Sequence, residues 1–495
     1  MALGTRRRQR QQDLWVHYSQ LPRSASHPFY EKLNQILDDE GFDAFVEDLC
    51  RRFYAPVMGR PSIPPGVYFR ALFAGFFEGL DSERQIAWRL RDSLSLRRFV
   101  GVALDESAPD HSSLSRTRRL VDLETHRAVF TWVLKVLARH KMLRGTTLAI
   151  DATTLEANAA LRSIVRRLTG ESYQDFLKKL AAESGIETPT REQLAKLDRD
   201  RKNKGSNEDW VNPHERDAKI ARMKDGRTHL AHKSEHAVDT GTGAIVAVTL
   251  QGADLGDTQT LGQTLGEAAA QLAAVAQDPA AEQQLAPAGI EELVADKGYH
   301  SQQVLEDLEK FEIRSYVASP ERPKRKRKAS RGGRCKGKGK RRGDKKRAKM
   351  TSQVRANRRR VRGRRGKRLQ RQRGELVERP FAHLFETGGM RRVHLRGRGN
   401  ISKRLLIHTA GFNLSLLLRS VCGTGKPRQM RELNEAGKQE KAAAGASQAE
   451  SRPQNSRLSL WERLVRRILA PWCGERRICF PRLFPCYDLH AAIAA

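Results

Sequence analysis

Apolar residues between positions 28 and 143 recur at the spacing of amphipathic helices. The segment GVYFRALFAGFFEGL (66–80) follows two prolines, and SERQIAWRLRDS (82–93) and PDHSSLSRTRRLVD (109–122) begin with residues that favour a helix N-terminus. THRAVFTWVLKVLARHKML (125–143) continues the same pattern. This part of the chain is therefore predicted to form a compact helical bundle.

After residue 143 the period changes, and short apolar runs alternate with helical patterns. Strands are predicted at 146–151, 228–239, 245–252, 291–296 and 312–319. Helices are predicted at 257–277, 301–311, 375–387 and 400–419. Strands and helices that alternate in this way indicate the α/β class, with a mixed sheet that carries helices on its faces.

Two insertions and two tails complete the predicted organisation. A basic arm at 1–27 precedes the helical domain at 28–143 and the α/β domain at 144–420. The α/β domain contains a polar helical insertion at 156–227 and a basic insertion at 320–373. A polar linker predicted to be disordered follows at 421–457, and then a tail at 458–495 with an amphipathic helix. No run of about 18 or more apolar residues occurs, so no transmembrane helix is predicted. The N-terminal MALGTRRRQRQQ lacks the apolar stretch of a secretory signal.

The positive charge of the chain is concentrated in one place. The formal net charge is +35, and residues 322–373 hold 28 Lys and Arg residues against one acid, Asp344. The rest of the chain is only mildly basic, so a polyanion, most simply nucleic acid, is the expected partner of this segment. It would hold phosphates without reading bases, which makes binding sensitive to salt. The six cysteines form no C-x-x-C pair, which argues against a zinc ribbon or a redox motif.

The predicted helical bundle also has a basic element. Arg116, Arg118 and Arg119 fall on one short predicted helix, and this helix together with its neighbour resembles the helix-turn-helix units that bind DNA. A helical bundle with solvated arginines fits the pattern equally well. DNA contact through these three arginines is therefore a hypothesis that stands beside a purely structural interpretation.

Three carboxylates lie at suggestive places in the α/β domain. Asp151 ends the first predicted strand, Asp296 ends the strand in ELVADKGYHS, and Glu378 lies on the helix after the basic insertion. If the two strands are neighbours, both aspartates lie at the carboxyl edge of the sheet, where open α/β sheets bind ligands. Three hard oxygen donors suit Mg²⁺, and a pair of such ions roughly 3.5–4 Å apart catalyses phosphodiester cleavage. Each acid also has an ordinary interpretation: an aspartate that caps a turn or helix, or a solvated helix glutamate.

Other polar residues near the strands have two interpretations each. His232, Glu235 and His236 are close enough in sequence for a metal site, but histidines on a strand beside a polar sheet edge are the favoured interpretation. Asp254 and Asp257 follow the third strand as outer acids or helix caps. Lys297, next to Asp296, is a candidate for contact with DNA phosphates.

Several segments together resemble a bacterial insertion-sequence transposase of the DDE class. They are LAIDATTLEANAA, KDGRTHLAHKSEHAVDTGTGAIVAVTLQGADLGDTQTL, ELVADKGYHS, GELVERPFAHLFETGGMRRVHLRGRGNISKRLLIHTAGFNL and, before them, GRPSIPPGVYFRALFAGFFEGLDSERQIAWRLRDSLSLRRF with PDHSSLSRTRRL. The resemblance covers roughly residues 28–420. It implies an RNase H-like catalytic domain behind a helical DNA-binding domain, and it places Asp151, Asp296 and Glu378 in the family's acidic triad.

The resemblance also implies an activity. Two divalent ions, Mg²⁺ or Mn²⁺, would support cleavage of double-stranded DNA at the terminal inverted repeats and joining to target DNA. The protein would act on DNA as a homodimer. It would be cytoplasmic and associated with the nucleoid. The alternatives are a metal-dependent nuclease on the same fold and a non-catalytic DNA-binding remnant.

The sequence departs from the family near the glutamate. Many related transposases carry an arginine four residues before it and a lysine seven residues after it, where this chain has Gly374 and Phe385. Arg379, Arg391 and Arg392 are the replacement candidates for gripping the DNA strand. Pro380 is compatible with a first helical turn and would kink a helix interior.

Overall fold

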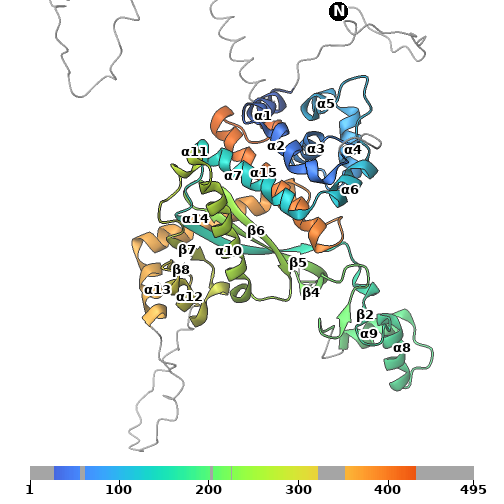
Figure 1. Ribbon diagram of the computed structural model, residues 1–495. Coiled ribbons are helices and arrows are strands. Elements are labelled where there is room, and N and C mark those ends of the chain that lie inside the picture. The colour runs from blue at the N-terminus through green and yellow to red at the C-terminus, as the bar shows by residue number, and fades with distance from the viewer. Residues whose placement is uncertain (1–26, 56–61, 201–204, 224–225, 321–351, 431–495) are drawn as a thin grey trace, which may run out of the picture. The chain divides into compact units, whose positions relative to one another are not determined.

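The computed structural model describes residues 27–55, 62–200, 205–223, 226–320 and 352–430 (Figure 1). The predicted basic arm except His27, most of the basic insertion, most of the linker and the whole predicted C-terminal helix lie outside these residues. The first ten residues of the predicted linker are described. They include the end of a long helix and a further helical turn at 427–430, which corrects the expectation of disorder there.

The helices predicted near the N-terminus are present. They are α1 (Pro28–Asp39), α2 (Phe42–Cys50), α3 (Pro65–Glu78), α4 (Glu83–Asp92), α5 (Leu94–Val100), α6 (His111–Leu120) and α7 (Leu123–Arg139). Side chains cap them as the sequence suggested, because Ser82, Asp110 and Asp122 each accept a hydrogen bond from the backbone N–H three residues later. The apolar helix α3 is buried along almost its whole length.

A six-stranded mixed sheet forms the centre of the α/β part. Its strands are β1 (Thr147–Glu156), β4 (Lys219–Arg222), β5 (Thr228–Asp239), β6 (Ile245–Gly252), β7 (Glu292–Ala295) and β8 (Arg314–Val317). The strands β4 and β6 pair with successive parts of one edge of β5, and β1 pairs antiparallel with its other edge. The strands β1, β7 and β8 then follow in parallel. This is the RNase H-like mixed sheet that the sequence predicted.

Helices cover both faces of this sheet. They are α10 (Asp257–Ala276), the short α11 (Pro279–Glu282), α12 (Gln302–Lys310), α13 (Ser352–Arg362), α14 (Arg364–Phe381) with a π-helical continuation (Ala382–Thr387), and α15 (Arg398–Cys422). The helices after the basic insertion begin at Ser352, which is 23 residues before the predicted start at 375. The side chain of Asn357 on α13 explains this early start, since it hydrogen-bonds both the N–H and the C=O of Val317 on the edge strand β8.

The insertion after β1 has a small core of its own. It contains α8 (Tyr173–Glu183), α9 (Arg191–Asp200) and the two-stranded sheet of β2 (Val165–Arg166) and β3 (Trp210–Val211). Trp210 is buried there against Tyr173 and Phe176. The prediction of a helical insertion is correct for the helices and missed the small sheet.

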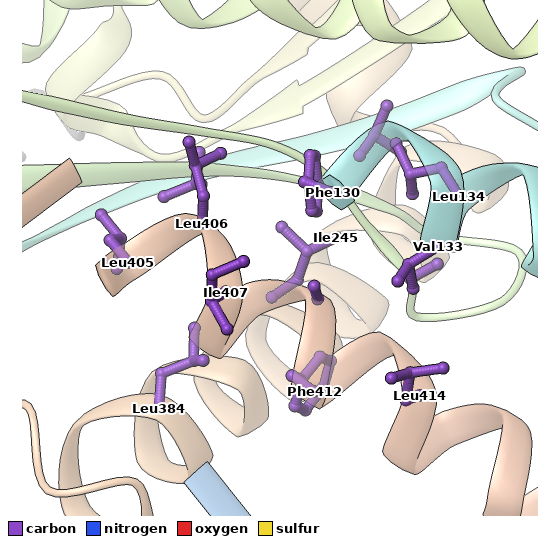
Figure 2. Packing of buried hydrophobic residues seen from close by; sticks show 14 of the residues in the cluster. Phe130, Val133, Leu134, Ile245, Leu384, Leu405, Leu406, Ile407, Phe412 and Leu414 are labelled. Carbon is purple, nitrogen blue, oxygen red and sulfur yellow. The ribbon is translucent and has the colours of Figure 1, made fainter. Parts of the chain in front are cut away.

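One hydrophobic core connects the N-terminal helices with the sheet. Helices α7 and α15 lie side by side (Figure 1), and Phe130 and Val133 on α7 lie near Ile245 on β6 and Ile407 on α15 (Figure 2). The core therefore runs across the domain boundary expected at residue 143. Within the described residues, the stretch that begins with α15 is long and apolar enough to span a membrane, but most of it is buried as a core helix.

Candidate active site

Two of the three predicted acids lie on adjacent strands at the same level. Strand β7 pairs in parallel with β1 up to Ile150 and Ala295, so the next residue on each strand is an aspartate, Asp151 and Asp296. The prediction that Asp151 ends its strand is wrong, because β5 continues to pair with β1 as far as Glu156. It is β7 that ends at this level, after Ala295.

An arginine joins the two aspartates. Arg373 on α14 places Nη1 3.0 Å from Asp151 Oδ2 and Nη2 3.9 Å from Asp296 Oδ1. Its side chain is only 16% exposed, while those of Asp151 and Asp296 are 26% and 45% exposed. The other oxygen of Asp151, Oδ1, accepts a hydrogen bond from the N–H of Ala152.

The surroundings of Asp151 disfavour an unpaired negative charge. Burial raises the pKa of Asp151 above its ordinary value, and the nearby charges of Asp296 and Asp257 raise it further, whereas the Ala152 N–H and Arg373 lower it. Carboxylates that repel one another at a half-buried place require positive charge nearby. In the described structure Arg373 supplies that charge.

Asp296 does not act as a helix cap. It precedes the short 3₁₀ turn Lys297–Tyr299, yet its side chain makes no capping hydrogen bond to that turn. The interpretation of Asp296 as a helix cap is therefore not supported, because the capping hydrogen bond is not formed.

The third predicted acid, Glu378, is not gathered with the other two. Helix α14 turns Arg373, Val377 and Pro380 toward the sheet, whereas Glu378 is exposed on its flank. Among the described residues no group of three His, Cys, Asp or Glu side chains is close enough to hold a metal ion. The pair Asp151 and Asp296 nonetheless fits Mg²⁺ by its chemistry, because this ion commonly takes one or two carboxylates and fills its remaining positions with water and phosphate.

Polar contacts fix helix α14 across the sheet. Arg365 makes two hydrogen bonds to the buried Glu292 at the start of β7, at 2.9 and 2.6 Å. Gln370 donates to the carbonyl oxygens of Ala295 and Tyr316. Together with Arg373 these contacts place successive turns of the helix over β8, β7 and β1.

Pro380 lies in the interior of α14, not in its first turn, because the helix begins at Arg364. Proline has no N–H to donate to the preceding turn, and the backbone changes to a π-helix two residues later. The predicted disturbance after Glu378 is therefore present as this change of helix type.

A buried carboxylate anchors the turn that follows Asp296. Glu235 on β5 is fully buried and accepts hydrogen bonds from the hydroxyl groups of Thr260 and Thr264 on α10 and of Tyr299, whose Oη lies 2.7 Å away. Burial raises the pKa of Glu235, while the three hydroxyl donors lower it. The motifs HKSEH, DTQTL and DKGY thus meet in one network on the face of the sheet opposite Arg373.

The same turn is packed against the start of α10. Asp257 accepts a 2.7 Å hydrogen bond from the buried Lys233 Nζ, and Gly298 lies against the Asp257 carboxylate. A Cβ atom at Gly298 would stand 2.2 Å from Asp257 Oδ2. Asp257 is the first residue of α10, whose N-cap is Gly256, so it is not the cap; its use as an outer acid stays a prediction.

Substitution of Gly298 by alanine should therefore destabilise the protein. The new methyl group has to displace Asp257 from Lys233, at a cost of about 1–2 kcal/mol in the free energy of unfolding. Urea denaturation followed by fluorescence measures this cost. Gly262→Ala is the control, because Gly262 lies exposed on α10 with open space around it, and alanine there should leave stability unchanged or raise it by up to about 1 kcal/mol. Equal midpoints for Gly298→Ala and the wild type would contradict the packing argument.

The histidine metal site considered from sequence is not formed. His232 lies 3.5 Å from the buried Glu215, and His236 is buried against Phe381 and Phe385 with its Nε2 next to Ser234. Glu235 points to the other face of the strand. Burial lowers the pKa of His236 to about 3, so it is a neutral core side chain.

The predicted DNA contacts differ in their surroundings. Arg116 and Arg119 are exposed on α6, but Arg118 is largely buried and pairs with Glu83 on α4, so its charge holds two helices together. Lys297 is exposed beside Asp296. Arg379 pairs with Glu375, Arg391 with Glu386, and Arg392 lies 3.8 Å from Glu156 at the end of β1.

The two departures from the family pattern have different consequences. Gly374 is a half-buried position next to Arg373, and Phe385 is buried against Phe381 and His236. Phe385 thus belongs to the core. Arg373, five residues before Glu378, was not singled out from the sequence, because it is one of 28 basic residues in its segment.

Comparison with known families agrees with the order of these elements. Residues 17–120 match the family described as "Transposase domain (DUF772)", and residues 144–414 match the family described as "Transposase DDE domain". No curated protein and no solved structure matches the chain. The first match ends with α6, and the second extends from the residues before β1 into α15.

Proposed function

Because the chain belongs to the DDE transposases of bacterial insertion sequences, we propose that it hydrolyses phosphodiester bonds at the ends of an element and joins the freed 3′ ends to target DNA. The observation that carries this proposal is the pair Asp151 and Asp296, set at one level on adjacent strands beneath a basic helix. The family acts on DNA and depends on divalent metal in general.

Asp151, Asp296 and Glu378 are the proposed metal ligands. The first two share a locus, and Glu378 follows Arg373 by five residues on the helix that crosses it. Two bound Mg²⁺ or Mn²⁺ ions would supply activation of the attacking oxygen and stabilisation of the leaving oxygen. The chain's own contribution is to fix the aspartates through the β1–β7 register and through the network around Glu235.

The proposed track for the DNA backbone is the solvent face of α13 and α14. Its exposed basic residues are Arg355, Arg359, Arg362, Arg364, Lys367, Arg368 and Arg371. Arg364, Arg371 and Glu378 are seven residues apart in turn, so they share one stripe of helix α14. DNA held along this stripe would be led toward the proposed site. Arg116 and Arg119 on α6 are proposed to contact the element ends, and Lys297 the DNA near the site. Arg379, Arg391 and Arg392 lie in exposed ion pairs that phosphates can replace.

Removal of charge from this stripe should weaken DNA binding in a salt-dependent way. One variant carries glutamine at four positions: Arg364, Lys367, Arg368 and Arg371. This removes up to four phosphate contacts, so the magnitude of the slope of log K against log salt should decrease by about 3–4. Fluorescence anisotropy with a labelled duplex at several salt concentrations measures the slope.

A matched variant separates local contact from net charge. Lys178, Lys179, Lys196 and Arg199 are exposed on α8 and α9, and their replacement with glutamine lowers the net charge by the same four units. This control should keep most of the wild-type slope. Equal slopes for the two variants would show that binding does not depend on the α14 stripe.

The proposed function is tested by the products formed on DNA. Full-length protein is incubated with Mg²⁺ or Mn²⁺, a duplex that carries the inverted repeat flanking the element, and a target plasmid. Cut and joined products support the transposase; cuts without joining support a nuclease; binding without either supports a DNA-binding remnant. Pairing of two ends by a homodimer is proposed as well, and should appear as a complex with two duplexes. The proposed place of action is the nucleoid in the cytoplasm.

A further inference from the structure

We propose that Arg373 is an internal cation that occupies the aspartate pair in the metal-free protein and competes with a divalent ion for it. This inference rests on the proposed function, since it takes Asp151 and Asp296 as metal ligands. It adds a residue that regulates when those ligands become available. Arg373 is thus a positioning residue whose side chain has two alternative places.

The competition follows from the atoms that Arg373 engages. Asp151 has one oxygen committed to the N–H of Ala152 and the other, Oδ2, committed to Arg373 Nη1 at 3.0 Å. Each oxygen keeps a second lone pair, so these hydrogen bonds alone do not exclude an ion. The guanidinium group, however, reaches both Asp151 and Asp296 and thus occupies the place of an ion that the two carboxylates would share, so the arginine has to give way.

Charge adds to this effect. The guanidinium group of Arg373 lies between Asp151 and Asp296 and is 16% exposed, so its positive charge is little screened by water. Two positive groups at the same pair of carboxylates repel each other. The arginine therefore lowers the affinity of the site for a divalent ion by Coulomb repulsion as well as by its place between the two carboxylates.

Arg373 is also free to leave without movement of its helix. Arg365 and Gln370 hold α14 on the sheet through Glu292, Ala295 and Tyr316, and these contacts do not involve the aspartate pair. The Nε of Arg373 is buried and has no hydrogen-bond partner among the described residues. The side chain is thus incompletely satisfied where it lies, and a new acceptor such as a DNA phosphate can draw it away.

The alternative is that Arg373 is a permanent structural ion pair. In that case its removal would leave two uncompensated carboxylates and distort the pair, and metal binding would not improve. The two interpretations predict opposite changes in metal affinity when Arg373 is removed. This change can be measured without DNA and without an activity assay.

The experiment is a titration of the full-length protein with Mn²⁺, with free Mn²⁺ followed by electron paramagnetic resonance. We expect Arg373→Gln to bind Mn²⁺ at least about tenfold more tightly than the wild type, the ratio that corresponds to one charge-assisted hydrogen bond. Arg139→Gln removes an ion-paired arginine at the end of α7, where it contacts Glu40 and Asp278 and not the aspartate pair, and should bind as the wild type does. Asp296→Asn should lose binding.

Each outcome decides the question. Unchanged or weaker Mn²⁺ binding by Arg373→Gln, or an equal gain in Arg139→Gln, would overturn the competition. No binding by any variant would overturn the metal site of the proposed function, and the competition with it. If Arg373→Gln fails to fold, Arg373→Lys takes its place, because lysine keeps the charge but lacks the fork that spans both carboxylates. Its affinity should exceed that of the wild type severalfold, and an equal affinity would overturn the proposal.

Discussion

Asparagine in place of Asp296 should reduce metal-dependent DNA cleavage more than about a hundredfold, while binding to DNA is retained. Loss of groups that merely orient metal ligands costs up to about a hundredfold in affinity or activity, so loss of a ligand should cost more. Asparagine keeps the size of aspartate, and the side chain is 45% exposed, so the fold should tolerate it. Cleavage of a labelled inverted-repeat duplex and gel-shift binding measure the two effects.

The matched control for this variant is Asp307→Asn on helix α12. Asp307 is half-exposed and, among the described residues, its side chain pairs with neighbours on its own helix, so the same chemical change should leave cleavage intact. Equal cleavage by Asp296→Asn and the wild type would return Asp296 to a structural role. That role would need a contact other than a helix cap, since the side chain makes no capping hydrogen bond.

The largest effect on stability is expected for Glu235→Ala. This change removes the acceptor shared by Thr260, Thr264 and Tyr299 inside the protein, and it leaves a cavity and three buried hydroxyl groups without their partner. We expect the free energy of unfolding to fall by about 3–5 kcal/mol. Urea unfolding monitored by circular dichroism measures the loss.

Tyr299→Phe provides the graded control, because it removes one hydroxyl group and leaves Glu235 with two donors. Its cost should be about 1–2 kcal/mol. Because Tyr299 lies three residues after Asp296, both variants should also cut DNA more slowly. A Glu235→Ala protein as stable as the wild type would show that the network does not anchor the turn.

Much of the α/β part could be predicted from the sequence, for a definite physical reason. Strands β1, β6 and β7 have apolar runs bounded by glycine or aspartate, and this pattern depends only on local burial. The predicted strands and helices occur in the predicted order, but the prediction missed α11, α13 and β4, which joins the main sheet from within the predicted helical insertion. A shared edge for Asp151 and Asp296 was expected on condition that their strands are neighbours, and the parallel pairing of β1 with β7 meets that condition.

The contacts that complete the candidate site could not be predicted in the same way. Arg373 has the same composition and charge around it as Arg368 or Arg371, and only the rotation of α14 makes it the one that reaches the aspartates. The sequence did not predict α13, because a highly basic segment suggests self-repulsion and not a helix. Packing of Asn357 and Arg360 on the edge strand β8 overrides that local tendency.

The buried network around Glu235 shows a different limit of sequence reasoning. The histidines beside it suggested a metal site, since strand periodicity brings residues 232 and 236 to one face. Periodicity also sends Glu235 to the other face, where hydroxyl groups of α10 satisfy it. A prediction of that partner requires the packing of a helix that lies 25 residues further along the chain.

The pairing of α7 with α15 has a consequence for the synthesis of the protein. The apolar face of α7 is complete once Arg139 is made, but its partner begins at Arg398, about 260 residues later. At 5–20 residues per second the ribosome needs roughly 13–50 s to close that interval. During this time Phe130 and Val133 lack the helix that finally covers them. Nascent chains are therefore expected to be substrates for chaperones, and messages that stop before α15 should give products that are degraded.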